Sequence, residues 1–253
     1  MKNVKIYLIL LLMGLISCAK DGNMQSASSG DESGLTGTGG STARFTLKGD
    51  YLYTVNSQSL KAFDLGNPAQ PIMRTETFLG VDIETIFPND NFLLIGSQSG
   101  MYIYDISQAA HPARVGFYEH VVSCDPVVAQ GNFAYVTLRT VGNGRCSRGI
   151  NAFEIIDISD PSAPELVASR PMNAPRGLGV GDIASVFVCE DGLVHLDVSD
   201  VHNIHELGHY NTASITQDVI PTGDNLILIA DDGLYQYKEN NGSLDLLSKI
   251  PVE

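Results

Sequence analysis

A short apolar motif that recurs five times constrains this sequence more than any other feature. Its clearest copy is the segment GMYIYDIS at residues 100–107. The other copies hold an aspartate, or in the last case a lysine, at the position of Asp105, and the five positions are Asp64, Asp105, Asp157, Asp197 and Lys238. The successive spacings are 41, 52, 40 and 41 residues. A unit of about forty residues that is rich in short apolar runs is typical of a propeller or a solenoid.

Each unit contains four short segments that favour β-strands and no window with a helical period. In the second unit these segments are 82–87, 92–96, 101–106 and 115–118. Turn residues separate them every eight to twelve positions, so the unit is predicted to be a sheet of four antiparallel strands. The sequence therefore predicts an all-β fold whose building block is a propeller blade.

Five such units account for the chain from residue 43 to its last residue. We expect blades at about 43–78, 79–120, 121–172, 173–211 and 212–253. A solenoid of the same units would expose an apolar face at each end, whereas a ring of blades shields its edges. We therefore predict a closed five-bladed β-propeller, and a sixth blade would need a unit that these residues do not contain.

The first seventeen residues are predicted to be a lipoprotein signal peptide. Lys2 and Lys5 precede an apolar run at residues 6–16, which is too short to span a bilayer. Ser17-Cys18 resembles the end of a bacterial lipobox, and the resemblance implies that Cys18 carries several acyl chains, palmitate among them. More than one chain gives durable membrane anchoring. The alternative is an ordinary secretory signal with an incidental cysteine.

Residues 18–42 form the lipidated cysteine and a flexible Gly/Ser linker, because they contain too few apolar side chains to order themselves. Removal of Lys2 and Lys5 leaves 13 basic against 29 acidic residues, a net charge of −16. Such a chain disfavours nucleic acid and anionic lipid surfaces as partners. We expect an outer-membrane protein held by its lipid, either on the periplasmic side or at the cell surface.

The third unit carries a family resemblance. Its segment IIDISDPSAP at residues 155–164 is similar to the repeat of the LVIVD family of bacterial and archaeal surface proteins, and units one, two and four fit it in part. The resemblance implies a β-propeller and names no activity. An aspartate just before a turn can accept hydrogen bonds from downstream backbone amides, so we interpret the repeated aspartates as structural.

The remaining cysteines predict one disulfide bond in an oxidising compartment. Cys124 stands before the first strand of the third blade and Cys146 in the loop between its second and third strands. In a propeller blade these two places lie at the same end, so a Cys124–Cys146 bond is geometrically reasonable. Cys189 ends an apolar strand and is predicted to be a buried free thiol.

The loop at residues 139–149 is the one long insertion, and it is basic in an otherwise acidic chain. The predicted ligand-binding residues are Arg139, Arg145 and Arg148 in this loop and Arg176 before the next blade. Insertions on one face of a repeat fold often mark the binding face, and a guanidinium group suits a carboxylate or another anion. Alternatively, these arginines pair with neighbouring acids such as Glu119, Asp125 and Glu190.

No catalytic residue, metal site or cofactor is predicted. The histidines His195, His202, His205 and His209 lie close in the sequence, but no cysteine or carboxylate completes a metal-ligand set at a recognisable spacing. Our first hypothesis is a non-enzymatic binding or scaffolding module that engages an unknown protein or glycan partner through one propeller face. The alternative is a propeller hydrolase or lyase with its site at the mouth of the central channel.

Overall fold

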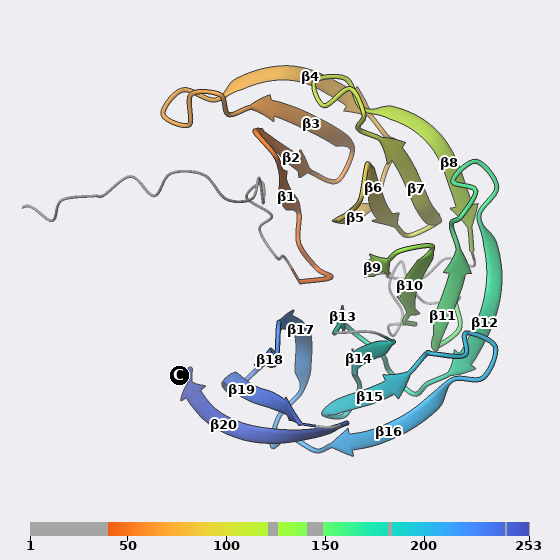
Figure 1. Cartoon of the computed structure of the whole chain (residues 1–253), viewed down its shortest axis with the longest axis vertical. Coiled ribbons are helices and arrows are strands. Elements are labelled where there is room, and N and C mark those ends of the chain that lie inside the picture. The colour runs from red at the N-terminus through yellow and green to blue at the C-terminus, as the bar shows by residue number, and fades with distance from the viewer. Residues whose placement is uncertain (1–39, 121–125, 141–148, 182–183, 241, 253) are drawn as a thin grey trace, which may run out of the picture. The chain divides into compact units, whose positions relative to one another are not determined.

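The computed structural model describes residues 40–120, 126–140, 149–181, 184–240 and 242–252, and these contain twenty β-strands in five sheets. All of them belong to the compact unit formed by residues 34–253. Figure 1 shows the sheets following one another in chain order about a common axis. The described residues contain no helix, and hence none long and apolar enough to cross a membrane.

We number the sheets in chain order. Sheet 1 contains β1 (Phe45–Lys48), β2 (Tyr51–Val55), β3 (Ser59–Asp64) and β4 (Ile72–Phe78). Sheet 2 contains β5 (Ile83–Asn89), β6 (Phe92–Ser97), β7 (Gly100–Asp105) and β8 (Ala113–Glu119). Sheet 3 contains β9 (Val127–Gln130), β10 (Phe133–Leu138), β11 (Ala152–Asp157) and β12 (Glu165–Pro171). Sheet 4 contains β13 (Leu178–Val180), β14 (Ser185–Cys189), β15 (Leu193–Asp197) and β16 (His205–Tyr210). Sheet 5 contains β17 (Thr216–Thr222), β18 (Asn225–Ala230), β19 (Gly233–Asn240) and β20 (Ser243–Pro251).

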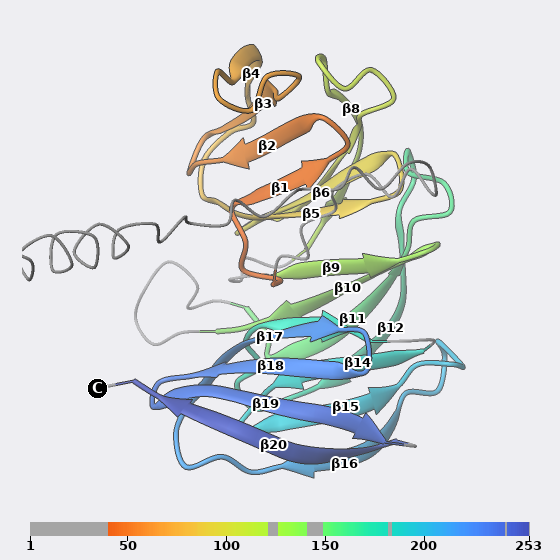
Figure 2. The same cartoon turned by 60° about the vertical axis from the view of Figure 1, so that its left-hand side comes forward.

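Within every sheet each strand pairs antiparallel with the next strand in the sequence. The first strand is the innermost, as the views in Figures 1 and 2 agree. The tight turn between the first and second strands needs a left-handed residue, which is Gly49, Gly131 or Gly223 in three sheets and Asp90 in sheet 2. The predicted fold class, with five blades of four antiparallel strands, is therefore confirmed.

Hydrophobic clusters fill the four junctions between consecutive sheets. Because side chains alternate along a strand, one face of each sheet packs against the preceding sheet and the other against the next one. Leu93 and Ile95 of β6, for example, pack against sheet 1, whereas Leu94 between them packs against sheet 3. The near-continuous apolar runs of the second strands follow from this burial on both faces.

The repeated aspartates are turn residues, as the sequence predicted. Each carboxylate accepts a hydrogen bond of 2.7 to 2.8 Å from the backbone N–H two positions downstream, in the pairs Asp64–Gly66, Asp105–Ser107, Asp157–Ser159 and Asp197–Ser199. These bonds hold the pKa of each carboxyl below its usual value, together with the serine hydroxyls at Asp105, Asp157 and Asp197 and with the Arg74 guanidinium at Asp64. The hydrogen bonds fix the bend that leads from the third strand to the fourth.

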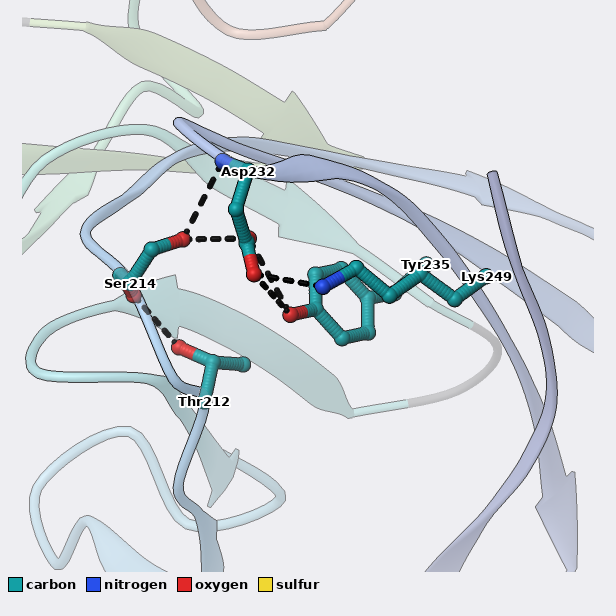
Figure 3. Close-up of polar contacts among 5 residues, drawn as sticks. All are labelled: Thr212, Ser214, Asp232, Tyr235 and Lys249. Atoms are coloured by element: carbon teal, nitrogen blue, oxygen red, sulfur yellow. Dashed lines mark hydrogen bonds and ion pairs between the residues drawn. The ribbon is translucent and has the colours of Figure 1, made fainter. Parts of the chain in front are cut away.

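Sheet 5, which has Lys238 in place of that aspartate, is held by a different polar cluster (Figure 3). Asp232 in the β18–β19 turn accepts hydrogen bonds from Ser214, from the Tyr235 hydroxyl and from the Lys249 ammonium, the last at 2.5 Å. Lys249 Nζ also lies 4.7 Å from the centre of the Tyr235 ring. The hydrogen bond from Lys249 leads the causes that hold the pKa of Asp232 well below its usual range. The cluster thus ties the start of β17 to β20.

The fifth junction, between sheet 5 and sheet 1, differs from the closed ring that we predicted. No hydrophobic cluster of the described residues spans it. Instead the segment before β1 reaches the inner strands of sheets 4 and 5 (Figure 1), where the Ser41 and Thr42 hydroxyls donate to Asp218 at 2.8 and 2.7 Å. Ser41 Oγ in turn accepts a hydrogen bond from the Leu178 backbone N–H at 2.9 Å. The link is polar and runs through the chain that leads into β1.

Candidate functional site

A cavity of about 340 Å³ lies at the end of the unit where the first strand of each sheet begins. All five sheets contribute to its wall. The lining residues are Thr42, Arg44, Glu84, Thr85, Pro126, Arg139, Arg176, Gly177 and Gln217. Most of them stand one or two residues before the buried apolar residue of the first strand in sheets 2 to 5. The cavity is therefore the mouth of the central channel of the propeller.

Backbone geometry brings the arginines of sheets 3 and 4 together. Arg139 directly follows β10, and Thr137 of that strand donates its hydroxyl hydrogen to the backbone carbonyl of Arg176. The Arg176 N–H donates to the carbonyl of Cys189 at 2.8 Å, which fixes the start of sheet 4. Arg139 and Arg176, from adjacent sheets, consequently line the same cavity.

Asp218 organises the wall of the cavity on the side of sheet 5. Its buried carboxylate accepts hydrogen bonds from Ser41 and Thr42, so the chain that carries Thr42 and Arg44 crosses the channel mouth. A side chain at Gly177 has no room, because its Cβ would lie 2.4 Å from Oδ1 of Asp218. Sheet 4 and sheet 5 approach closely here, and the Gly177 N–H donates to the Gln217 carbonyl at 3.0 Å.

The electrostatics of the cavity favour an anion. Burial and, to a smaller degree, the positive charge of Arg176 lower the pKa of Arg139, and Glu84 opposes this shift. Within the described ranges, neither these two arginines nor Arg44 takes part in an ion pair. Among the described residues of the lining, Glu84 is the one carboxylate, and its Oε1 accepts a hydrogen bond from Gln98 at 3.4 Å. The described part of the lining therefore holds three arginines and one acid.

The predicted ligand-binding residues are brought together in part. Arg139 and Arg176 line the same cavity, whereas Arg145 and Arg148 lie outside the described residues. Glu190, which we considered as an ion-pair partner, instead accepts hydrogen bonds from the backbone N–H groups of residues 173 and 174. Sequence reasoning missed Arg44, although it directly precedes the apolar residue of the first inner strand.

Of the four cysteines, only Cys189 lies within the described residues. Cys189 is a buried free thiol, as predicted, and burial raises its pKa above the usual value. Cys18, Cys124 and Cys146 lie outside the described residues, so the lipidation and the disulfide bond stay predictions.

The four histidines of sheet 4 do not come together. His195 is buried between Phe187, on which its ring stacks at 4.4 Å, and Ser185, whose hydroxyl lies 3.1 Å from Nε2. The other three, His202, His205 and His209, are exposed on β16 and the turn before it. Across the described part of the chain, no group of three or more His, Cys, Asp or Glu side chains could hold a metal ion.

Comparison with solved structures places the chain in a broad class, the β-propellers. A protein of unknown function from Desulfotomaculum acetoxidans superposes with a TM-score of 0.64 at 12% identity, over 80% of this chain and 66% of that one. The periplasmic gluconolactonase PpgL of Pseudomonas aeruginosa gives 0.60 at 15% identity, over 81% and 68%. A Bacteroides fragilis protein, provisionally assigned as a 6-phosphogluconolactonase, gives 0.65 at 12% identity, over 83% and 70%. At these identities the likeness concerns the fold alone, and the chain spans about two thirds of the length of these proteins.

A match to a repeat family defines the protein more closely than the propeller fold does. Residues 39–77, 88–120 and 148–170 match the family model described as LVIVD repeat. The chain is therefore a propeller-type protein with LVIVD repeats, which confirms the resemblance seen in the sequence. No curated protein matches the chain in sequence.

Proposed function

We propose that this protein is a non-enzymatic, lipid-anchored binding module of the bacterial outer membrane, on its periplasmic side or at the cell surface. It binds an anionic group, a carboxylate above all, in the cavity at the channel mouth. The group belongs either to a free small molecule or to a glycan or protein side chain presented by a partner. The anchor is the lipidated Cys18, followed by a flexible linker that ends before Ser41, because Ser41 is buried and donates a hydrogen bond to Asp218.

One observation carries the binding proposal, namely that Arg139 and Arg176 face one cavity without an ion-pair partner among the described residues. Two adjacent guanidinium groups repel each other, and burial removes the water that would screen them. A bound carboxylate removes that repulsion and accepts forked hydrogen bonds from both groups. The cavity, at about 340 Å³, has room for a ligand as large as a monosaccharide acid.

The enzymatic alternative, a hydrolase or lyase, receives its support from the gluconolactonase with which the fold superposes. Its site would be the same channel mouth. The described lining residues include no histidine, cysteine or serine, and Glu84 is the one side chain there that could act as a general base. A binding role needs no such group, so we favour it. A lactonase assay with glucono-δ-lactone separates the two, since the binding module gives no rate above the uncatalysed one.

Calorimetry of the full chain in detergent tests the binding proposal. We expect citrate, gluconate or inorganic phosphate to bind and glucose, which is neutral, to give no heat. Arg139→Ala and Arg176→Ala should each weaken binding by about tenfold or more, because each removes a charged hydrogen bond worth roughly 1.5–3 kcal/mol. Arg170→Ala is the matched control, since Arg170 pairs with Glu206 on the outer strands. Equal affinity in all three variants, or no binding of any of the anions, would refute the proposal.

A further inference from the structure

Two surfaces of the unit display side chains that are buried at the equivalent positions of the other sheets. The first is the face of sheet 1 against which no described sheet packs. In every sheet, one residue of the first strand pairs with the fourth residue of the second strand. In sheets 2 to 5 this residue packs against the preceding sheet. In sheets 2 to 5 this residue is at most 1% exposed, and the four are Ile86, Val127, Leu178 and Val219. In sheet 1 it is Phe45, which is 61% exposed.

The second surface is the face of sheet 5 against which no described sheet packs. The residue four positions before the repeated aspartate points to the next sheet in the chain. In sheets 1 to 4 it is at most 1% exposed, and the four are Leu60, Met101, Phe153 and Leu193. In sheet 5 it is Leu234, which is 37% exposed, and Ile250 beside it on β20 is 61% exposed.

The junctions inside the chain show how such faces fit together. The loop between the third and fourth strands of one sheet lies against the sheet before it. In the first junction the hydroxyls of Tyr53 and Thr75 donate to the carbonyls of Ala109 and Ala110, at 3.0 and 2.6 Å. In the second junction the carbonyl of Pro161 comes so near Gly116 that a Cβ there would lie 1.8 Å from it. Packing of this loop is thus a repeated feature of the fold.

Both halves of this contact recur, on sheet 1 and on sheet 5, without a partner among the described residues. The corresponding loop of sheet 1, residues 66–71, is exposed throughout. On sheet 5, Ile227 and Ser248 occupy the positions of Tyr53 and Thr75 and line a cavity of about 180 Å³ together with Leu234 and Ile250. Sheet 1 therefore offers the loop and sheet 5 the surface that would receive it.

We propose that sheet 5 of one molecule binds sheet 1 of a second copy of this chain. The faces are complementary because the same pair of faces forms all four junctions within the chain. The contact is head-to-tail, so it joins two different surfaces and leaves one of each free at the ends of a pair. If the rotation that relates one molecule to the next brings the last molecule back to the first, the molecules form a ring. Otherwise they form an open row.

Sedimentation equilibrium of the full chain, in a detergent matched in density to the solvent, tests this inference. We expect the protein mass per particle to rise with concentration from that of one mature chain to twice that value or more. The mature chain is lighter than the 27.2 kDa of the full sequence, because residues 1–17 are removed. Phe45→Asp and Leu234→Asp should each keep the mass at one chain, since each blocks one of the two surfaces. An equimolar mixture of the two variants should give dimers and nothing larger, because one intact surface of each kind remains.

Leu207→Asp is the matched control, because Leu207 is 48% exposed on the outer strand of sheet 4 and lies on neither surface. This variant should associate like the unaltered chain. A circular dichroism spectrum of each variant shows whether its sheets are intact. A single-chain mass at every concentration, or association that persists in either single variant, would overturn the inference.

Discussion

The Ser41 hydroxyl donates a hydrogen bond of 2.8 Å to Oδ1 of Asp218, across 177 residues of sequence. The bond is buried, and it joins the chain that leads into the first sheet to the inner strand of the last one. The same chain segment carries Thr42 and Arg44 into the wall of the cavity. The geometry of the candidate site therefore depends on this contact between the two ends of the propeller.

Replacement of Asp218 should destabilise the fold and disturb the cavity together. Asp218→Ala leaves the Ser41 and Thr42 hydroxyls without their acceptor, and we expect a loss of about 2–3 kcal/mol in the free energy of unfolding. Urea denaturation followed by circular dichroism measures it. Asp224→Ala, at an exposed turn of the same sheet, serves as the control and should change stability little. Equal stability of the two variants would show that the contact contributes nothing.

The turn aspartates should contribute modestly to stability, each through its own hydrogen bond. Asp157→Ala removes the acceptor of the Ser159 N–H, and we expect a loss of about 1 kcal/mol or less at neutral pH, as for an exposed hydrogen bond. Because the pKa of this carboxyl is lowered in the folded state, its contribution is present above the ordinary aspartate pKa and is lost as the pH falls through the folded value. Denaturation curves of both proteins should converge in acid, and a difference that grows there would contradict the assignment.

His195 should make the fold sensitive to mild acid. Burial is the largest of the causes that act on its pKa, which lies below the usual value in the folded state. The unfolded chain therefore takes up a proton first, near pH 6.5, and stability falls as the pH drops further, by at most about 1.4 kcal/mol per pH unit. His195→Gln should abolish this slope and His202→Gln, at an exposed position, should retain it. The same slope in all three proteins would assign it to other groups.

Glu154 should give the opposite pH dependence, so that its contribution to stability falls as the pH rises. Its carboxyl is buried at the junction of sheets 2 and 3, and burial raises its pKa although the Tyr118 hydroxyl donates to it at 3.3 Å. A raised folded pKa gives stability that is full below the ordinary glutamate pKa and is lost as the pH rises through the folded value. Glu154→Gln should therefore raise the melting temperature at pH 8 and leave it nearly unchanged at pH 4. A lower melting temperature at pH 8 would show that the ionised carboxylate stabilises this junction.

The fold was predictable from the sequence because consecutive sheets bury equivalent positions against each other. That burial preserves a period of about forty residues, and strand boundaries such as the predicted 92–96 differ by one residue from the observed Phe92–Ser97. The role of the turn aspartates was predictable too, since an Asx turn is a local contact. The polar closure through Ser41 and Asp218 was not, because a single contact between distant residues leaves no periodic signal.

The candidate site was predictable in part. Arg139 stood out because it begins the long insertion, and Arg176 because it precedes the next blade at the same end. Arg44, Glu84 and Gln217 belong to short segments that carry no motif, although each stands one or two residues before the buried or core-facing residue of a first strand. A comparison of the residues just before the first strand in all five units would have shown that they are neighbours at the channel mouth.

A crystal structure of the chain with the anion that binds most tightly in calorimetry tests the central claim most directly. We predict density for the ligand in the cavity lined by Thr42, Arg139 and Arg176, with its acidic group within hydrogen-bonding distance of both guanidinium groups. An empty cavity, with the anion bound at another surface, would contradict the account.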